Sequence, residues 1–224
     1  MVWAQPSRSL VASRIEHTLL KPEASTEDIR RLCREAVDHS FHGVCVHGCR
    51  VALAYQCLED SEVKVIAVTG FPLGAVDSDC KRYETEAAVD NGAAEIDVVM
   101  NLGLFKDRAY KAVLRELRDV VEAADERPVK VIIETCLLSQ EEKAEACRLV
   151  LDSGAQFVKT STGFSRAGAT IEDIRFLREC VGPSFGVKAS GGIRDAAMAL
   201  AMLQAGADRI GSSAGAPLLH GLTD

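Results

Sequence analysis

The chain has 224 residues and a mass of 24.1 kDa, which suits one domain spanning residues 1–224. Hydrophobic residues make up 47% of the sequence, enough to build a sizeable core. The formal net charge of -7 and the pI near 5.3 argue against an electrostatic nucleic-acid surface.

The first residues, MVWAQPSRSLVASRIEH, lack the apolar core of a signal peptide. No stretch of the sequence approaches the roughly 18 unbroken apolar residues of a membrane span. The eight cysteines are spread through helix-like and strand-like segments rather than forming a small secreted framework, which predicts reduced thiols. We therefore expect a cytoplasmic protein with no membrane partner.

Short β-rich runs alternate with amphipathic segments along the chain, a pattern typical of βα units around a parallel sheet. The predicted strands are residues 15–20, 43–47, 64–70, 95–101, 129–135, 157–162, 185–190 and 209–214. Eight such units in this length predict a single (β/α)8 TIM barrel. An open doubly wound sheet is the alternative, but no GxGxxG follows the first strand.

Signals for the starts and ends of helices fall between the predicted strands, as this alternation requires. Capping-box-like pairs, Ser25 with Asp28, Ser139 with Glu142 and Thr170 with Asp173, stand where helices should begin. The segments NGAAEID (91–97), SGAQFVK (153–159) and AGADRIG (205–211) share a C-cap glycine followed by alanine and a strand. This weak repeat predicts Asp97, Lys159 and Gly211 at matching heights on three strands.

The run HGVCVHGC holds His42, Cys45, His47 and Cys49, the last three at the period of a strand. Such residues can bind zinc, but zinc ligands usually come as two spaced pairs and no second cluster exists. We therefore expect no metal here, with Cys45 packed in the core.

Lys159 and Lys188 lie within strands that otherwise read as buried, where an isolated charge is costly. An ordinary lysine, with a pKa of about 10.4, is almost fully protonated at pH 7, so a nucleophilic lysine needs a nearby cation or desolvation. Two lysines on neighbouring strands can therefore act as a nucleophile and its activator, with Asp97 moving protons. The alternative places both lysines at the lower rim, paired with Glu95 or Glu134.

Glycine-rich loops follow the seventh and eighth predicted strands, SGGIRD (190–195) and GSSAG (211–215). Backbone amides in such loops, with serine hydroxyls and a helix start nearby, suit a phosphate at the place where TIM barrels often hold one. Gly163, after the sixth strand, can add another amide. The alternative is that Gly191-Gly192 forms a plain turn.

At these residues the sequence resembles the 2-deoxyribose-5-phosphate aldolases. The shared motifs occur in family order and cover nearly the whole chain: HTLLKP (17–22), GFPLGA (70–75), EIDVVMN (95–101), KVIIETCLL (130–138), FVKTSTGFS (157–165), GVKASGGIR (186–194) and RIGSS (209–213). The resemblance implies that Lys159 is the Schiff-base lysine, Lys188 the activating lysine and Asp97 the proton-relay acid. It also implies a substrate-binding set and a phosphate-binding set, respectively Thr18, Cys45 and Thr162, and Gly163, Gly191, Gly192, Gly211 and Ser213.

By the same resemblance we expect a (β/α)8 barrel that uses no cofactor and no metal, forms a homodimer or a larger homo-oligomer, and takes a phosphorylated sugar and acetaldehyde as small-molecule substrates. Three positions depart from the family pattern: Glu16 replaces a typical Asp, His47-Gly48 replaces Asn-Pro or Tyr-Pro, and Ala214 replaces a frequent Ser. The rival functions are a Schiff-base barrel with a different donor and a non-catalytic barrel that binds phosphosugars.

Overall fold

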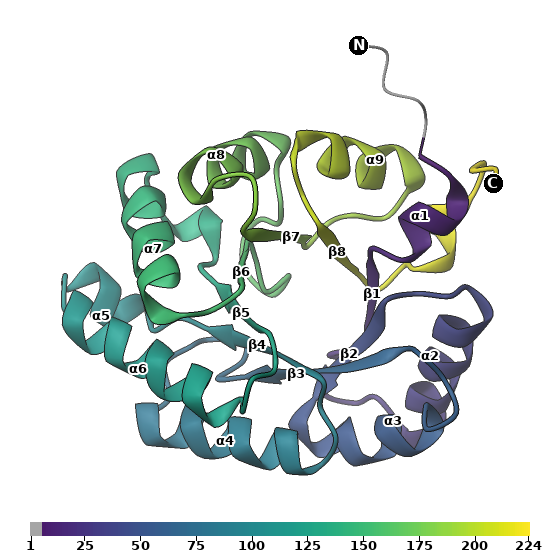
Figure 1. Cartoon of the computed structure of the whole chain (residues 1–224), viewed down its shortest axis with the longest axis horizontal. Coiled ribbons are helices and arrows are strands. Elements are labelled where there is room, and N and C mark those ends of the chain that lie inside the picture. The colour runs from purple at the N-terminus through teal and green to yellow at the C-terminus, as the bar shows by residue number, and fades with distance from the viewer. Residues whose placement is uncertain (1–5) are drawn as a thin grey trace.

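The computed structural model describes residues 6–224, and the N-terminal extension around Trp3 lies outside this range. Eight parallel strands close into a barrel in sequence order, with helices arranged around it (Figure 1). The strands are β1 (Ile15–Thr18), β2 (Gly43–His47), β3 (Lys64–Thr69), β4 (Glu95–Val99), β5 (Val129–Ile132), β6 (Phe157–Lys159), β7 (Gly186–Ser190) and β8 (Arg209–Ser212). The predicted (β/α)8 fold is confirmed.

Most strands end one to three residues earlier than the sequence predicts. Residues 160–162 and 133–135, for example, continue the β-rich pattern but belong to the loops at the top of the barrel. The helices are α1 (Arg8–Ala12), α2 (Thr26–Asp38), α3 (Val51–Cys57), α4 (Ser78–Asp90), α5 (Leu102–Lys106), α6 (Tyr110–Ala123), α7 (Gln140–Ser153), α8 (Ile171–Val181) and α9 (Ala196–Ala205). Short 3-10 turns are η1 (Gly48–Arg50), η2 (Thr135–Leu137) and η3 (Ala216–Leu219).

Two of the predicted capping boxes are complete, at the starts of α2 and α7. At α8 the Thr170 side chain accepts the Asp173 N–H, but the Asp173 carboxylate does not return to the cap. It accepts hydrogen bonds from Lys143 and Thr135 instead. Asp173 therefore connects the start of α8 to Lys143 of α7 and to Thr135 after β5.

The strand registers fix which side chains share a level in the barrel. Followed once round the ring, they return to β1 eight residues away, a shear of eight. A barrel of this shear stacks inward side chains in layers of four from alternate strands. The Lys159 layer comes from the even strands, and its members are Cys45, Asp97, Lys159 and Gly211. The Lys188 layer below it comes from the odd strands, and its members are Glu16, Ile66, Lys130 and Lys188.

The registers thus place Asp97, Lys159 and Gly211 in one layer, as the weak repeat predicts. Each follows a glycine, Gly92, Gly154 or Gly206, whose positive φ ends the preceding helical segment.

The two faces of the sheet differ in chemistry. Outward residues such as Val44, Ile96 and Val131 are buried in one large apolar core between strands and helices. Within the barrel a small apolar cluster, Leu20, Cys45, Ile66 and Val68, is confined to the side formed by β1–β3. Ionisable side chains occupy much of the remaining interior, so the energy of apolar burial resides mainly outside the strands.

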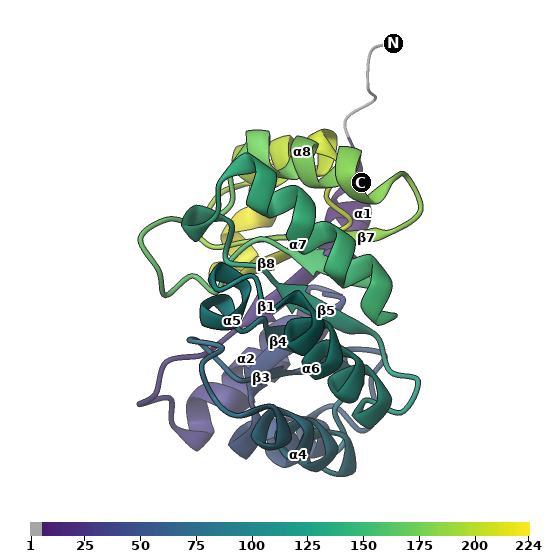
Figure 2. The same cartoon turned by 90° about the vertical axis from the view of Figure 1, so that its left-hand side faces the viewer.

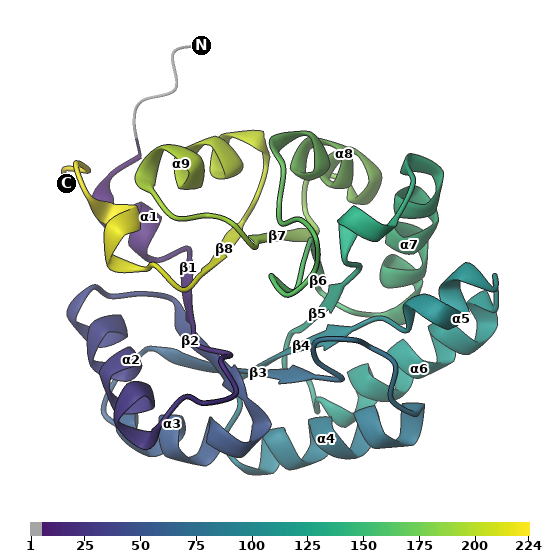
Figure 3. The same ribbon diagram turned by 180° about the vertical axis from the view of Figure 1, so that it is seen from behind.

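The two ends of the described chain lie beside each other, as the side and rear views show (Figures 2 and 3). The Arg8 N–H donates to the Thr223 carbonyl at 3.0 Å. Helix α1 contacts η3. Among residues 6–224, no helix combines the length and apolar character needed to cross a membrane.

Candidate active site

A pocket of about 270 Å³ opens at the C-terminal ends of the strands, where TIM barrels carry their active sites. Eight of the eleven predicted site residues line it: Thr18, Lys159, Thr162, Gly163, Gly191, Gly192, Gly211 and Ser213. The other three, Cys45, Asp97 and Lys188, are fully buried beneath it. The structure therefore brings Lys159 to the surface of the pocket and keeps Lys188 and Asp97 behind it.

A larger cavity, of about 870 Å³, lies elsewhere, between His47, Cys49 and the α4 residues Asp79 and Tyr83. It contains none of the buried lysines. The smaller pocket is the candidate site because it joins an accessible lysine to an acid and to anion-binding loops, whereas the larger cavity offers volume without that chemistry.

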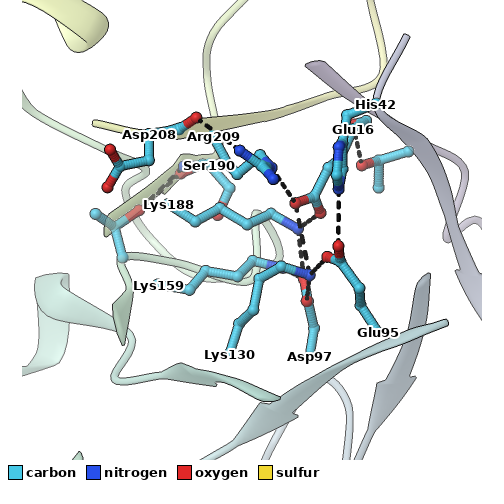
Figure 4. Close-up of polar contacts among 12 residues, drawn as sticks. Glu16, His42, Glu95, Asp97, Lys130, Lys159, Lys188, Ser190, Asp208 and Arg209 are labelled. Atoms are coloured by element: carbon cyan, nitrogen blue, oxygen red, sulfur yellow. Dashed lines mark hydrogen bonds and ion pairs between the residues drawn. The ribbon is translucent and has the colours of Figure 1, made fainter. Parts of the chain in front are cut away.

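One carboxylate, Asp97, holds three lysines together (Figure 4). Lys159 Nζ lies 2.8 Å and Lys188 Nζ 2.6 Å from the same Asp97 oxygen, Oδ2. Lys130 Nζ lies 2.9 Å from the other oxygen, Oδ1. Burial disfavours a charged carboxylate, but the surrounding lysines, Lys130 above all, outweigh it and hold the pKa of Asp97 well below its usual range. Asp97 is thus an anion aimed at Lys159 Nζ.

Glu16 and Glu95 complete the network. Glu16 ion-pairs with Lys188, and its other oxygen lies 3.5 Å from Lys130 Nζ. Lys130 Nζ also lies 2.5 Å from Glu95 Oε2, and His42 Nε2 donates to Glu95 Oε1 at 2.8 Å. Despite its departure from the family's aspartate, Glu16 still meets the lysines.

Lys130 is the functional residue that the sequence analysis missed. It is fully buried on β5, and its register places it beside Asp97. The signal was present, because Lys130 is a charged residue inside an apolar strand like Lys159 and Lys188. The alternative of lower-rim lysines paired with Glu95 or Glu134 describes Lys130, which pairs with Glu95, better than Lys159 or Lys188.

The buried charges around Asp97 bear on whether Lys159 is charged. The ionic network around Asp97 holds three carboxylates, Glu16, Glu95 and Asp97. Apart from Lys159, it holds three cations: Lys130, Lys188 and Arg209, whose Nε lies 4.0 Å from Glu16 Oε1. With His42 counted as neutral, the three cations balance the three carboxylates of this network without a charge on Lys159. An uncharged amine is the form of lysine that attacks a carbonyl group.

The carboxylates keep the other two lysines charged. Burial disfavours an ammonium, but Asp97 and Glu16 outweigh it and raise the pKa of Lys188 above its ordinary value. Burial is likewise outweighed at Lys130, where Asp97, Glu16 and Glu95 raise the pKa. Lys130 and Lys188 are therefore fixed cations flanking Asp97.

Glu95 should make the fold sensitive to acid. Burial opposes its charge, but Lys130 and His42 lower the pKa of Glu95 to about 2 from 4.5. A carboxylate with a depressed folded-state pKa stabilises above the unfolded value, and this contribution is lost as pH falls from about 4.5 through about 2. We expect Glu95→Gln to show a smaller loss of unfolding free energy than the parent between about pH 6 and about pH 3, measured by urea titration. Equal losses in the two proteins would contradict this assignment.

The residues of the HGVCVHGC run point to different places. His42 bonds to Glu95, His47 Nε2 lies 3.0 Å from the Leu20 carbonyl, and Cys49 is exposed beyond the end of β2. Glu16, His42 and Glu95 do place ligand atoms within 4.8 Å of one another. Lys130 already provides a cation to both of those carboxylates. We therefore assign this cluster to the ionic network.

Cys45 lies in the Lys159 layer but on the apolar side of the barrel. It packs with Leu20, Ile66 and Val68, next to Phe71. Burial raises the pKa of its thiol to about 11. Cys45 is therefore a neutral, apolar part of the wall beneath the pocket.

The glycine loops offer free amides. The N–H groups of Gly163, Gly191, Gly192 and Ser213 have no hydrogen-bond acceptor within residues 6–224. All four residues line the pocket, and Arg194 lines it with them. The three glycines have φ near +80° (83°, 85° and 81°), a conformation that L side chains rarely adopt. Converging free amides beside an arginine form a suitable site for a phosphate group.

Glycine is needed at position 211 for a different reason, which is steric. A Cβ atom there would lie 3.2 Å from Lys188 Cε and 3.0 Å from Ser190 Cβ. Glycine at this position therefore leaves room for the Lys188 side chain to cross the barrel toward Asp97.

Two of the departures lie outside the charged network. His47 packs edge-on against Phe71 and, with Gly48, lines the larger cavity. The Ala214 N–H donates to Ser212 Oγ at 3.0 Å, and that hydroxyl donates to the Ile193 carbonyl. Ala214 thus contributes to the β8 loop through its backbone.

Comparisons with known proteins agree with the motifs. A model of the DeoC/LacD family of aldolases matches residues 11–221. Deoxyribose-phosphate aldolase 1 of Bacillus licheniformis is 53% identical over 95% of this chain and 96% of its own length. Deoxyribose-phosphate aldolase of Halalkalibacterium halodurans is 54% identical over 96% of both chains. The deoxyribose phosphate aldolase of Aeropyrum pernix, described as a unique tetramer, has a TM-score of 0.90 and 36% identity over 95% of this chain and 91% of its own.

Proposed function

This chain belongs to the DeoC/LacD family of aldolases, and we propose that it is a deoxyribose-phosphate aldolase whose Schiff base forms on Lys159. It reversibly cleaves 2-deoxy-D-ribose 5-phosphate to acetaldehyde and D-glyceraldehyde 3-phosphate. The observation that carries the Schiff-base assignment is the charge balance of the ionic network around Asp97, in which three carboxylates meet three cations besides Lys159. Lys159 is also the lysine of the buried network that lines the pocket.

In the synthetic direction, Lys159 Nζ attacks the carbonyl carbon of acetaldehyde, and the adduct loses water to give an iminium ion. Loss of a proton from the methyl carbon gives an enamine, which adds to the aldehyde carbon of D-glyceraldehyde 3-phosphate. Water then releases the product and regenerates the amine. Asp97 lies 2.8 Å from Lys159 Nζ and accepts and returns protons, directly or through water.

The phosphate of the substrate binds to the free amides of Gly163, Gly191, Gly192 and Ser213, with Arg194 supplying charge. Thr18 and Thr162 flank the carbon chain of the substrate. The apolar cluster that includes Cys45 reaches the pocket through Leu20 and offers an apolar surface to the two-carbon donor.

Lys188 can be tested through the pH dependence of catalysis. Lys188→Met removes a cation from the balanced interior, so the remaining negative charge should favour protonated Lys159. We expect the acidic limb of the kcat/KM profile to move to higher pH, and Glu16→Gln to move it to lower pH. Lys106→Met, which removes a surface lysine paired with Glu142, serves as the control. If the acidic limb does not move in Lys188→Met or in Glu16→Gln, the balance of buried charges does not set the protonation state of Lys159.

The deciding experiment for the proposed function is reductive trapping. The protein is mixed with acetaldehyde and sodium borohydride, and the intact mass and the modified peptide are determined. We expect one reduced two-carbon adduct, on the peptide containing Lys159. Parallel reactions with acetone and dihydroxyacetone test the rival donors. A labelled Lys159 with one of these alone would indicate a different Schiff-base aldolase, and labelling scattered over surface lysines would remove the assignment.

We extend the proposal to assembly and location. The Aeropyrum pernix relative is described as tetrameric, which supports a homo-oligomer, a dimer or larger, for this chain. All eight cysteines are free thiols, in keeping with the cytoplasm. Light scattering coupled to size exclusion would give the number of subunits.

A further inference from the structure

Glu134 adopts an unusual backbone conformation directly after β5. Its φ of 44° and ψ of 66° lie in the left-handed region, which disfavours residues with a side chain. Its side chain is buried, with 3% exposed. Because such strain persists only where the surroundings enforce it, the contacts of this carboxylate need an explanation.

The Glu134 carboxylate is directed at the loop that follows β6. Thr162 Oγ1 donates to Glu134 Oε2 at 2.5 Å, and the Thr162 N–H points to the same oxygen at 3.4 Å. The Thr162 hydroxyl in turn accepts the Phe164 N–H at 3.1 Å. Hydrogen bonds therefore run from Glu134 through Thr162 to Phe164.

This chain of bonds leaves one amide in the loop unused. Of residues 162–164, the amides of Thr162 and Phe164 are directed at internal acceptors. The Gly163 N–H has none within residues 6–224. Gly163 has a positive φ and lines the pocket with the other glycines. Fixing the residues on either side of Gly163 fixes the direction of its amide.

We propose that Glu134 is a positioning residue that sets the affinity for the substrate's phosphate group by holding Thr162, Gly163 and Phe164. This rests on the proposed function, because it takes a phosphorylated substrate in this pocket as given. Glu134 does not line the pocket itself. Its carboxylate acts through Thr162, and its strained backbone places that carboxylate between the β5 and β6 loops.

The test compares substrates with and without phosphate. Glu134→Asn keeps a residue that tolerates the left-handed conformation but shortens the side chain below the reach of Thr162. We expect KM for 2-deoxy-D-ribose 5-phosphate, and Ki for inorganic phosphate as competitive inhibitor, each to rise about tenfold, the scale of one lost charge-assisted hydrogen bond. kcat/KM for unphosphorylated 2-deoxy-D-ribose should change by less than about twofold. Glu134→Gln, which keeps the reach, should lie between Asn and the parent.

Two further variants provide a control and a second way to break the chain of hydrogen bonds. Glu145→Gln makes the same type of change at a half-buried α7 residue paired with Arg148, and should leave all constants unchanged. Thr162→Val removes the hydroxyl that links Glu134 to Phe164, so it should raise the same two constants. The double variant with Glu134→Asn should add little to either single change, because both break one chain of bonds.

Equal effects on phosphorylated and unphosphorylated substrates, or a fall in thermal stability with unchanged KM and Ki, would overturn the positioning role. Should Glu134→Asn not fold, Glu134→Gln decides the question on the same constants. Borohydride trapping of acetaldehyde needs no phosphate. A variant that still labels Lys159 but shows no phosphate-specific change refutes the role of Glu134 alone, whereas absence of labelling in the parent refutes the proposed function.

Discussion

Lys159→Ala is expected to lower kcat for cleavage of 2-deoxy-D-ribose 5-phosphate by at least about 10⁴-fold, the scale seen when a covalent nucleophile is removed. Lys21 also lines the pocket, but it is exposed and lies outside the buried network, so we expect no other lysine to take over the attack. The barrel should stay folded, because the remaining interior charges balance without Lys159. A coupled assay for released acetaldehyde and a thermal melt by circular dichroism would measure the two effects.

Lys64→Ala is the matched control, since Lys64 also lies on a strand, at the start of β3, but is exposed. It should retain full activity. Lys159→Ala protein that is folded and still turns over at an appreciable fraction of the parental rate would mean that another group forms the Schiff base.

Asp97→Asn is expected to damage both stability and catalysis. Asn keeps the shape but removes the charge that three buried lysines share, and breaking a buried ion pair in this way costs about 3 to 5 kcal/mol of unfolding free energy. It also removes the group that accepts protons beside Lys159, which should lower kcat by about 10² to 10⁴. Urea unfolding and steady-state kinetics measure the two losses separately.

A second change separates the two roles of Asp97. In Asp97→Asn/Lys130→Met one negative and one positive charge leave together, so the interior regains its balance. We expect much of the lost stability to return while kcat stays low. If activity returned along with stability, Asp97 would serve only to hold the lysines, and the proton relay would need another group.

The fold was predictable because the spacing of hydrophobic residues and the glycines at helix ends are both visible in short stretches of sequence. Eight β-rich runs, with capping signals at three of the helices between them, left few architectures open, and the repeat at Gly92, Gly154 and Gly206 even placed Asp97 and Lys159 in one layer. Strand ends were less well predicted, because Ile133 and Thr160 keep a strand-like sequence while their backbones already serve the loops at the pocket.

The site was predictable only in part, for a physical reason. Lys159 and Lys188 stood out as charges in apolar strands, and family motifs supplied their roles. The pairing of Lys130 with Glu95 and the contact of Glu16 with Lys188 depend on register and shear, which bring together residues more than thirty positions apart. The role proposed for Glu134 depends on its left-handed backbone conformation, which no local sequence pattern predicts.

The layered interior also bears on how the barrel comes together. The three carboxylates of the ionic network, Glu16, Glu95 and Asp97, all belong to the first four strands, and the cations that meet them, Lys130, Lys159, Lys188 and Arg209, all belong to the last four. In each half of the ring taken alone, the strands would contribute network charges of one sign, and the network side chains of two copies of the same half would repel each other. Joining of the N-terminal half to the C-terminal half is therefore electrostatically selective, and the catalytic lysine meets its acid only where the two halves come together.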